Sequence, residues 1–456
     1  METQLRALSC AARIIRQVKK GVSEGSIDPD AADEELQSIT RSLFACVPYV
    51  SMVESATSVR APVGLQSAVE ALVKQIDPGA KLLLRPKPNL GYGCLARLPD
   101  VIPALLDTAD NTSRLFGLDP VDVEGILDAH GHRLVVISFP SLERAGLLHH
   151  ACIGHELGHF LIEARECDER IAGQLEKCGT DITQAVDEVR PGLSVGEFAV
   201  HASSAAQVWD AWLRETLADI AACWLMGPAA LGSLLAVALA TGERPMYSDV
   251  PRPPFTKHPH VVYRVMVMLD ELKEFWEVEW ASAEQAGEDH LSEVGRRLRA
   301  LHQRCQAFVS THYKRMEEPY ATVYEHALSA AKGLKTQLFA ESTIQYRVEK
   351  FAREVPDLAE KISARIIPLE VGFLAGPERK SSQMADWRSI LNAGLLMEPQ
   401  QVPLTGAMDK QETGWSERFS YDERLLRAVE KAELARQYED SRRRMSRGAW
   451  PPEEQP

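Results

Sequence analysis

The chain has 456 residues, which is enough for two or three domains and a substantial hydrophobic core. Its composition, 45% hydrophobic and 25% charged, is ordinary for a soluble globular protein. The formal net charge of −14 argues against nucleic acid as the main partner, because binding a phosphate backbone requires a basic face.

Cysteine spacing and apolar patterning bear on the cellular compartment of the chain and on whether it spans a membrane. The eight cysteines are scattered and form no C-x-x-C pair, which argues against a cysteine-built zinc site. Residues 1–20 are amphipathic and lack the apolar core of a signal peptide, so we expect free thiols and a cytoplasmic location. The most apolar window, residues 220–240, is broken by Gly227-Pro228 and predicts two buried helices, with no membrane span.

The first third of the chain reads as helices followed by a change of pattern. Residues 1–80 have the apolar spacing of helices, the third of which is expected at 65–76. Residues 81–85 are a short strand candidate, and the prolines and glycines after them predict a loop. Two short helices are expected at 105–116 and 119–127.

Residues 133–139 form the best strand pattern in the chain, rich in β-branched residues and closed by Pro140. Ser141 is expected to cap the helix that follows. Two interpretations of the strand stay open. It could be an edge strand that binds extended substrate backbone, as beside the metal-binding helix of zinc peptidases, or an ordinary internal strand.

The helix after this strand carries the pattern H-E-x-x-H. His155 and His159 are four residues apart and lie one turn apart on the same helix face, so both imidazoles can reach one ion. Glu156 is rotated by about 100° from His155, so it can stand beside a metal and accept a proton from water there. Gly158 inside a helix costs about 1 kcal/mol relative to Ala, which calls for a packing or access reason.

Two histidines do not complete a zinc site, so a third ligand is needed. The best candidate is Glu215, and Asp219 lies one turn further on, where it could hold the outer nitrogen of a ligand histidine. With His155 and His159, Glu215 would leave one coordination position open, as a catalytic zinc requires. Competing candidates for the third ligand are Glu188, Glu197, His201 and Asp210.

These motifs resemble those of gluzincin metallopeptidases, and most closely the family of CAAX prenyl endopeptidases and HtpX-like bacterial proteases. Three elements match that family in order: His155–His159 as H-E-x-x-H, Glu215–Asp219 as E-x-x-A-D, and His258-Pro259 followed by Arg264. The resemblance implies one Zn²⁺ per chain, with His258 holding the substrate or stabilising the oxyanion. It also implies that Arg264 braces the site by pairing with a carboxylate. The match covers about residues 130–275.

A rival resemblance is to the ImmA–IrrE group of repressor-cleaving peptidases, whose second helix ends in a Leu-Met-Pro run. Residues 221–228 are similar to that run. However, 55 residues separate His159 from Glu215, which is longer than that compact group prefers. The His258-Pro259 element also favours the first family.

Residues beyond the motifs are mostly helical. The pattern from 276 to about 365 is long, charged and heptad-like, which indicates either a bundle or a coiled-coil-like arm. Residues 366–415 are expected to be irregular, and 421–446 a charged helix. Packing is the expected role of Cys152, His149, His150, Tyr247, Tyr263 and Trp209.

We therefore expect a mainly α (α+β) fold: an N-terminal helical region at 1–80, a zincin-like core with a small sheet at 81–275, and a C-terminal helical region at 276–456 with a disordered tail at 451–456. The expected activity is that of a zinc metallopeptidase, a hydrolase acting on intracellular protein or peptide substrates. In this prediction His155, His159 and Glu215 bind the metal, Glu156 is the general base, and Asp219 supports a ligand. The helical flanks would bind a protein partner. The alternative from another class is a helical interaction protein built on a non-catalytic zincin scaffold.

Overall fold

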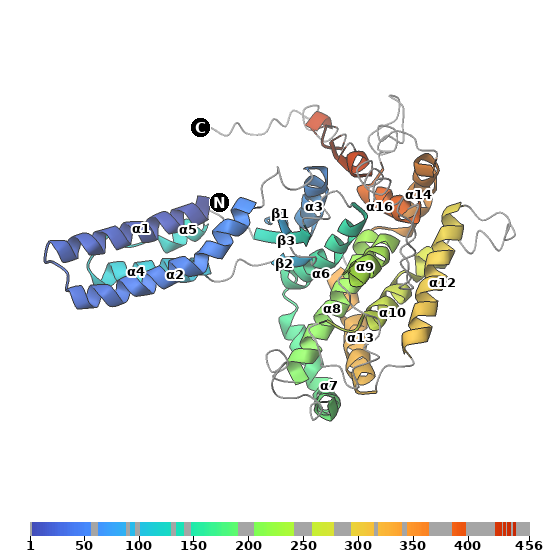
Figure 1. Cartoon of the computed structure of the whole chain (residues 1–456), viewed down its shortest axis with the longest axis horizontal. Helices are drawn as coiled ribbons and strands as arrows, with labels where there is room; N and C mark the ends of the chain where they lie inside the picture. Colours follow the sequence, from blue (N-terminus) through green and yellow to red (C-terminus); the bar gives the residue numbers. More distant parts are fainter. Residues whose placement is uncertain are drawn as a thin grey trace.

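The structure is a computed structural model, and its helices surround one small sheet (Figure 1). It describes residues 2–55, 63–87, 92–95, 101–128, 134–140, 147–189, 205–240, 258–277, 293–313, 318–339, 344–363, 385–397, 425–430, 432–434, 436–438 and 441–443. The expected mainly helical class with a small sheet is confirmed. In these residues no helix is both apolar and long enough to cross a bilayer.

Three strands form the sheet, in the order β1-β3-β2. Strand β3 (Leu134–Pro140) pairs in parallel with β1 (Lys81–Lys87) and antiparallel with β2 (Gly93–Leu95). Both of its edges are thus occupied, so the interpretation of β3 as a free edge strand is wrong and the internal alternative is confirmed. Its residues from Val135 to Phe139 are buried or nearly so, as suits a central strand covered by helices.

The H-E-x-x-H pattern lies on a helix, as predicted. A 3₁₀ turn (Leu147–Cys152) leads directly into α6 (Ile153–Ala164), and Cys152 occupies the N-cap without a side-chain cap. The expected cap, Ser141, lies outside the described residues. After α6 the chain continues as α7 (Asp168–Val189).

The apolar window forms two helices that meet at a glycine. Helix α8 (Ala205–Met226) ends at Gly227, whose φ of 65° is the left-handed conformation that glycine adopts without strain, and α9 (Pro228–Ala240) begins at the next residue. Proline at the first position of α9 has no N–H that the helix would leave unpaired. The predicted break at Gly227-Pro228 is therefore confirmed.

Helices α6 and α8 pack unusually close together. A Cβ added at Gly158 would lie 2.7 Å from the Ala218 Cα and 2.9 Å from the Ala218 carbonyl oxygen. Gly158 therefore has the packing role that its place in a helix called for. The close approach brings the motif residues of α6 opposite those of α8.

The N-terminal helices share a hydrophobic cluster that is separate from the main one. Helices α1 (Glu2–Ser23) and α2 (Pro29–Ser55) pack with α4 (Val101–Leu115) and α5 (Val123–Asp128), and Figure 1 shows these four as an arm beside the sheet. Helix α3 (Val63–Ile76) instead joins the main cluster beside β1.

The C-terminal helices complete the main cluster around α8, as a bundle and not as a separate coiled-coil arm. This group consists of α10 (Val261–Glu271), α12 (Glu293–Tyr313), α13 (Glu318–Phe339), α14 (Val348–Ser363) and α16 (Trp387–Met397). Helix α12 packs on α10, and α13 on α7 and α8. Helix α16 lies within the 366–415 segment expected to be irregular, so that expectation is wrong for Trp387–Met397.

Side chains of helix α16 also form hydrogen bonds with the C-terminal end of α8. The Asn392 amide nitrogen donates to the Met226 carbonyl at 2.8 Å, and its oxygen accepts from the Ala229 N–H at 2.8 Å. Arg388 donates to the Leu225 carbonyl at 3.2 Å. The last carbonyls of a helix have no partner within it, and here side chains from far along the chain supply them.

Candidate metal centre

Two histidines of α6 present ring nitrogens to the same point. The Nε2 atoms of His155 and His159 lie 3.1 Å apart. The rings are nearly perpendicular, with an interplanar angle of 90° and centroids 4.8 Å apart. The four-residue spacing within one helix produces this convergence, as the sequence predicted.

Glu215 of α8 completes the group from the opposite side. Its Oε2 lies 3.1 Å from the His155 Nε2, and its Oε1 lies 3.4 Å from the His159 Nε2. A tetrahedral zinc with bonds of 2.0–2.2 Å separates its ligand atoms by roughly 3.3–3.6 Å. The three separations of 3.1, 3.1 and 3.4 Å are within a few tenths of an ångström of that spacing. Within the part of the chain that the structure describes, these residues form the group that could hold a metal ion.

Among the competing candidates for third ligand, Asp210 is the one whose side chain the structure describes, and it has another partner. Asp210 accepts from the Arg214 Nε at 2.9 Å and 3.1 Å, so Arg214 pairs with Asp210 and leaves Glu215 to the histidines. Glu197 and His201 lie outside the described residues. The side chain of Glu188, in the last turn of α7, also lies outside the described residues.

Asp219 orients the first histidine. Its Oδ1 lies 2.8 Å from the His155 Nδ1, and because an ionised carboxylate can only accept, Nδ1 carries the hydrogen. The Nε2 of His155 is therefore the atom that faces the group. This is the carboxylate–histidine support seen behind zinc ligands in general, and it holds both the tautomer and the ring plane.

Arg264 of α10 in turn holds Asp219. Its guanidinium donates from Nε to Oδ2 at 2.8 Å and from a terminal nitrogen to Oδ1 at 2.7 Å. Burial alone would raise the pKa of Asp219, but the charge and hydrogen bonds of Arg264 outweigh burial and lower it. Arg264 is 8% exposed, and one of its terminal nitrogens also lies 3.3 Å from the His155 Nδ1, so Arg264 supports His155 both through Asp219 and by direct contact.

The carboxylates set the charge state of the ligand residues. Burial by itself would lower the pKa of His155, but Asp219, helped by a hydrogen bond to Glu215, raises that pKa to about 10. Burial would raise the pKa of Glu215, yet hydrogen bonds from His155, His159 and His258 hold it well below its ordinary value. Glu215 is thus an ionised, buried carboxylate, which is the form that binds metal.

His258 reaches the same carboxylate from outside. Its Nδ1 lies 2.8 Å from the Glu215 Oε2, while the side chain is 47% exposed. It is the most solvent-accessible of the three histidines around Glu215. The sequence placed His258 at the active site, and the structure brings it to the rim of the metal group.

Glu156 stands beside the ligands without joining them. It is 7% exposed and lines a cavity of about 160 Å³ together with His155 and His258. Glu156 is not one of the residues that could hold a metal ion, which fits its rotation of about 100° around the helix from His155. A carboxylate in that place can exchange protons with a molecule in the cavity.

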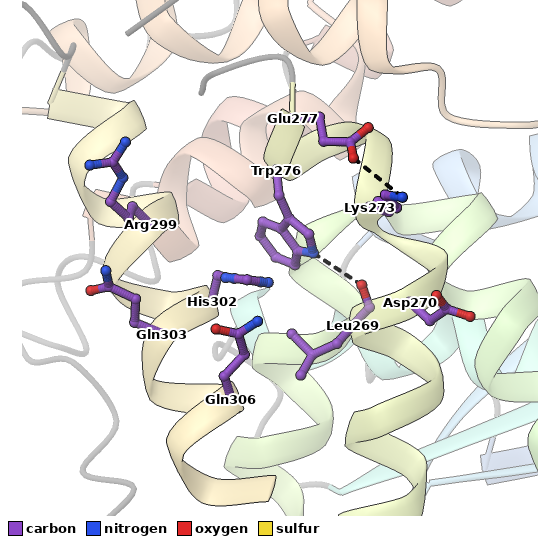
Figure 2. A pocket seen from close by; sticks show the side chains of 9 residues that line it. All are labelled: Leu269, Asp270, Lys273, Trp276, Glu277, Arg299, His302, Gln303 and Gln306. Carbon is purple, nitrogen blue, oxygen red and sulfur yellow. Dashed lines mark hydrogen bonds and ion pairs between the residues drawn. The ribbon is translucent and has the colours of Figure 1, made fainter. Parts of the chain in front are cut away.

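A larger hollow lies near the C-terminal end of α10, between residues 269–277 and α12. It has a volume of about 600 Å³ and is lined by the end of α10, by residues 273–277 after it and by α12, with Trp276 and His302 facing each other (Figure 2). The Trp276 Nε1 donates to the Leu269 carbonyl at 3.1 Å, and its indole ring lies 5.2 Å from the His302 ring. None of its lining residues belongs to the metal group.

Two features near the site were not apparent from the sequence. Tyr92, expected in a loop, lines the cavity and hydrogen-bonds the His150 Nδ1 at 3.2 Å. His150 is fully buried against Phe139, which confirms its expected packing role. Helix α9, predicted only as a buried helix, contributes one wall of the cavity.

Comparison with known proteins adds no relative to this geometry. A scan against protein-family models, a search of curated proteins and a search of solved structures find no match to the chain. The resemblance to gluzincin peptidases therefore stays a prediction that rests on the motif residues and on their arrangement.

Proposed function

We propose that this protein is a metal-dependent peptidase, with zinc as the metal and proteins or peptides as substrates. The observation that carries the proposal is the convergence of His155, His159 and Glu215 at separations of 3.1 to 3.4 Å. Two imidazoles and one carboxylate are a ligand set of catalytic zinc sites, in which three protein ligands leave a position open.

The residues around the group match the needs of amide hydrolysis. A zinc ion held there supplies Lewis acidity, which polarises a carbonyl and makes water more acidic. Glu156 would accept the proton of the attacking water and pass it to the leaving amine. Asp219 and Arg264 would keep the ring of His155 in place during the reaction. His258, at the rim, would donate to the substrate oxygen as charge builds on it.

Strand β2 is the part of the sheet best placed to bind extended substrate. Strand β3 has both edges paired, whereas β2 pairs on one side with β3 and also contacts α6. In the proposed activity the backbone pairing first expected of β3 therefore belongs to β2.

Metal content tests the proposal most directly. We expect elemental mass spectrometry of the purified protein to find about one zinc per chain, and much less in Glu215→Ala. Asp210→Ala is the matched control, because it removes a carboxylate from the same helix without touching the group. No zinc in the wild type after reconstitution, or equal zinc in Glu215→Ala, would overturn the ligand assignment.

Glu156→Gln separates catalysis from metal binding. We expect this variant to keep its zinc and lose hydrolysis of casein or a quenched-fluorescent peptide mixture, because the amide has no basic oxygen at neutral pH. If hydrolysis by the wild type were undetectable, or unchanged in Glu156→Gln, the non-catalytic scaffold would be the better interpretation.

A further inference from the structure

The side chain of Lys87 extends across the sheet to the strand that we propose binds substrate. Lys87 is the last residue of β1, and β3 lies between β1 and β2. Strands separated by one other strand lie roughly 10 Å apart, so the lysine side chain crosses the end of β3 to reach β2. The Lys87 Nζ lies 3.1 Å from the place that a Cβ at Gly93 would take, which puts the ammonium group next to the backbone of β2.

Gly93 and Cys94 face opposite sides of the sheet, because neighbouring residues of a strand alternate. Cys94 faces α6, which contacts β2: burial raises the pKa of its thiol, and the charges of two glutamates of α6 raise it further. Gly93 and Lys87 share the other face, since their partners on β3, Ser138 and Pro140, are two residues apart. A substrate strand paired with β2 has the same alternation, so the residue opposite Gly93 would direct its side chain to the face that carries Lys87.

Lys87 carries its charge without a fixed partner. In the described part of the chain, no carboxylate forms an ion pair with its ammonium group. Burial lowers the pKa of Lys87, and the charge of Glu156 offsets only part of that effect. Two residues earlier on the same face, the Arg85 Nε is buried and has no hydrogen-bond partner among the described residues. Both cations are half-buried, so a carboxylate added beside them would gain charge-assisted hydrogen bonds and favour the charged form of the lysine.

We propose that the Lys87 ammonium group binds a carboxylate of the substrate, carried by the substrate residue that pairs opposite Gly93 of β2. The inference rests on the proposed peptidase function and gives it a class of substrate, acidic peptides. The carboxylate comes from an Asp or Glu side chain or from the C-terminus of a peptide, since both present the same charge and the same acceptor oxygens to the lysine. Lys87 therefore determines specificity and takes no part in the chemical step.

Cleavage of matched peptides by the zinc-loaded protein tests the preference. Each peptide is acetylated and amidated at its ends and carries either Glu or Gln at one varied position, and mass spectrometry gives relative kcat/KM values. We expect one position at which Glu exceeds Gln by about five- to tenfold, with a ratio that falls as salt is added. A second set, with a free or an amidated C-terminus, distinguishes a terminal carboxylate from a side chain. Equal rates within both sets would overturn the inference.

Substitutions at Lys87 tie the preference to this residue. Lys87→Met should reduce the Glu-to-Gln ratio to about one, whereas Lys87→Arg should keep most of it. Lys87→Glu should invert the preference, so that a peptide with Lys at the same position is cleaved faster than one with Glu. Lys81→Met is the matched control, because Lys81 is exposed at the other end of the same strand. A purely structural role of Lys87 would lower all rates alike and invert nothing, and that outcome would overturn the inference.

Peptide binding separates this inference from the activity itself. Fluorescence anisotropy on the zinc-loaded Glu156→Gln variant compares labelled Glu and Gln peptides of the same set. We expect the Glu peptide to bind about fivefold tighter, and Lys87→Met in this background to abolish the difference. That result beside a wild type that cleaves no peptide would refute the peptidase function and keep the carboxylate site. Equal affinities beside intact cleavage would refute the carboxylate site alone, and a chain that neither binds nor cleaves any peptide would overturn both.

Discussion

Arg264 and Asp219 form a buried bidentate ion pair, and the same carboxylate bonds the His155 Nδ1 at 2.8 Å. The two residues are 45 positions apart and lie on α10 and α8. The orientation of a ring on α6 therefore depends on a contact between two other helices. A substitution that shifts any one of these three helices should therefore change the orientation of the His155 ring at the metal group.

The first prediction concerns the carboxylate. Asp219→Asn keeps the shape of the side chain but removes the charge that supports His155, so we expect zinc affinity to fall about 10- to 100-fold. Competition with a chelator of known affinity measures the change. Asp210→Asn, on the same helix and outside the group, should leave the affinity within twofold of the wild type. An unaffected Asp219→Asn would show that His155 needs no carboxylate.

The second prediction concerns the arginine. Arg264→Met leaves the Asp219 charge buried without its main partner, which should reduce the free energy of unfolding by about 3–5 kcal/mol in urea denaturation. Arg264→Lys should be nearly as damaging, because one ammonium cannot reproduce two parallel hydrogen bonds. In the double variant Asp219→Asn with Arg264→Met, the loss should be smaller than the sum of the single losses. Strict additivity would contradict the direct pairing.

The third prediction compares two glycines of α6. A Cβ at Gly158 meets backbone atoms of Ala218 at 2.7–2.9 Å, whereas a Cβ at Gly154 meets the buried Met226 side chain, nearest at its Cγ, and stays 3.4 Å from the Ala222 backbone. Gly158→Ala should therefore force α6 and α8 apart, destabilise the protein by about 1–3 kcal/mol and weaken zinc binding. Gly154→Ala is the matched control and should cost less than Gly158→Ala, because a side chain can change its rotamer where backbone cannot and the helix gains propensity. Thermal unfolding and metal titration of both variants measure the difference, and equal effects would count against the close approach.

The fourth prediction concerns acid stability. Burial would raise the pKa of Asp386, but Arg388 and then Lys350 outweigh burial and lower it well below its ordinary value. A carboxyl whose pKa is lower in the folded state stabilises the protein above its unfolded pKa, roughly 3.9, and loses that contribution as the pH falls. Asp386→Asn should thus lower the free energy of unfolding by about 3 kcal/mol at pH 7. The gap to the wild type should narrow between pH 5 and pH 3. A gap that stayed constant over that range in urea titrations would contradict the assignment.

Much of the metal group was predictable because its geometry is local. His155 and His159, like Glu215 and Asp219, are four residues apart on helices, so each pair shares a face whatever the rest of the fold does. Only the meeting of α6 with α8 is non-local. Gly158 marked that contact in the sequence, since a glycine there makes sense where another helix comes close.

The parts that the sequence did not predict depend on distant partners. An apolar run such as 134–140 suits an edge or a central strand equally well, and its place in the sheet is decided by pairing with segments about 40 to 55 residues earlier. One of those partners, Gly93–Leu95, is too short to show a pattern. Helix α16 likewise depends on contacts that Asn392 makes with the end of α8, which no local window contains.

The way α16 closes α8 has a consequence for the order of events during synthesis. The Met226 carbonyl accepts a hydrogen bond from Asn392, which is synthesised 166 residues later. At about 5–20 residues per second, a ribosome needs roughly 10 to 30 s to cover that distance. Until then the C-terminal end of the helix that carries Glu215 lacks these hydrogen bonds, although His155, His159 and Glu215 have already been made. This end of α8 should therefore become stable only late in synthesis, when most of the protein has been built.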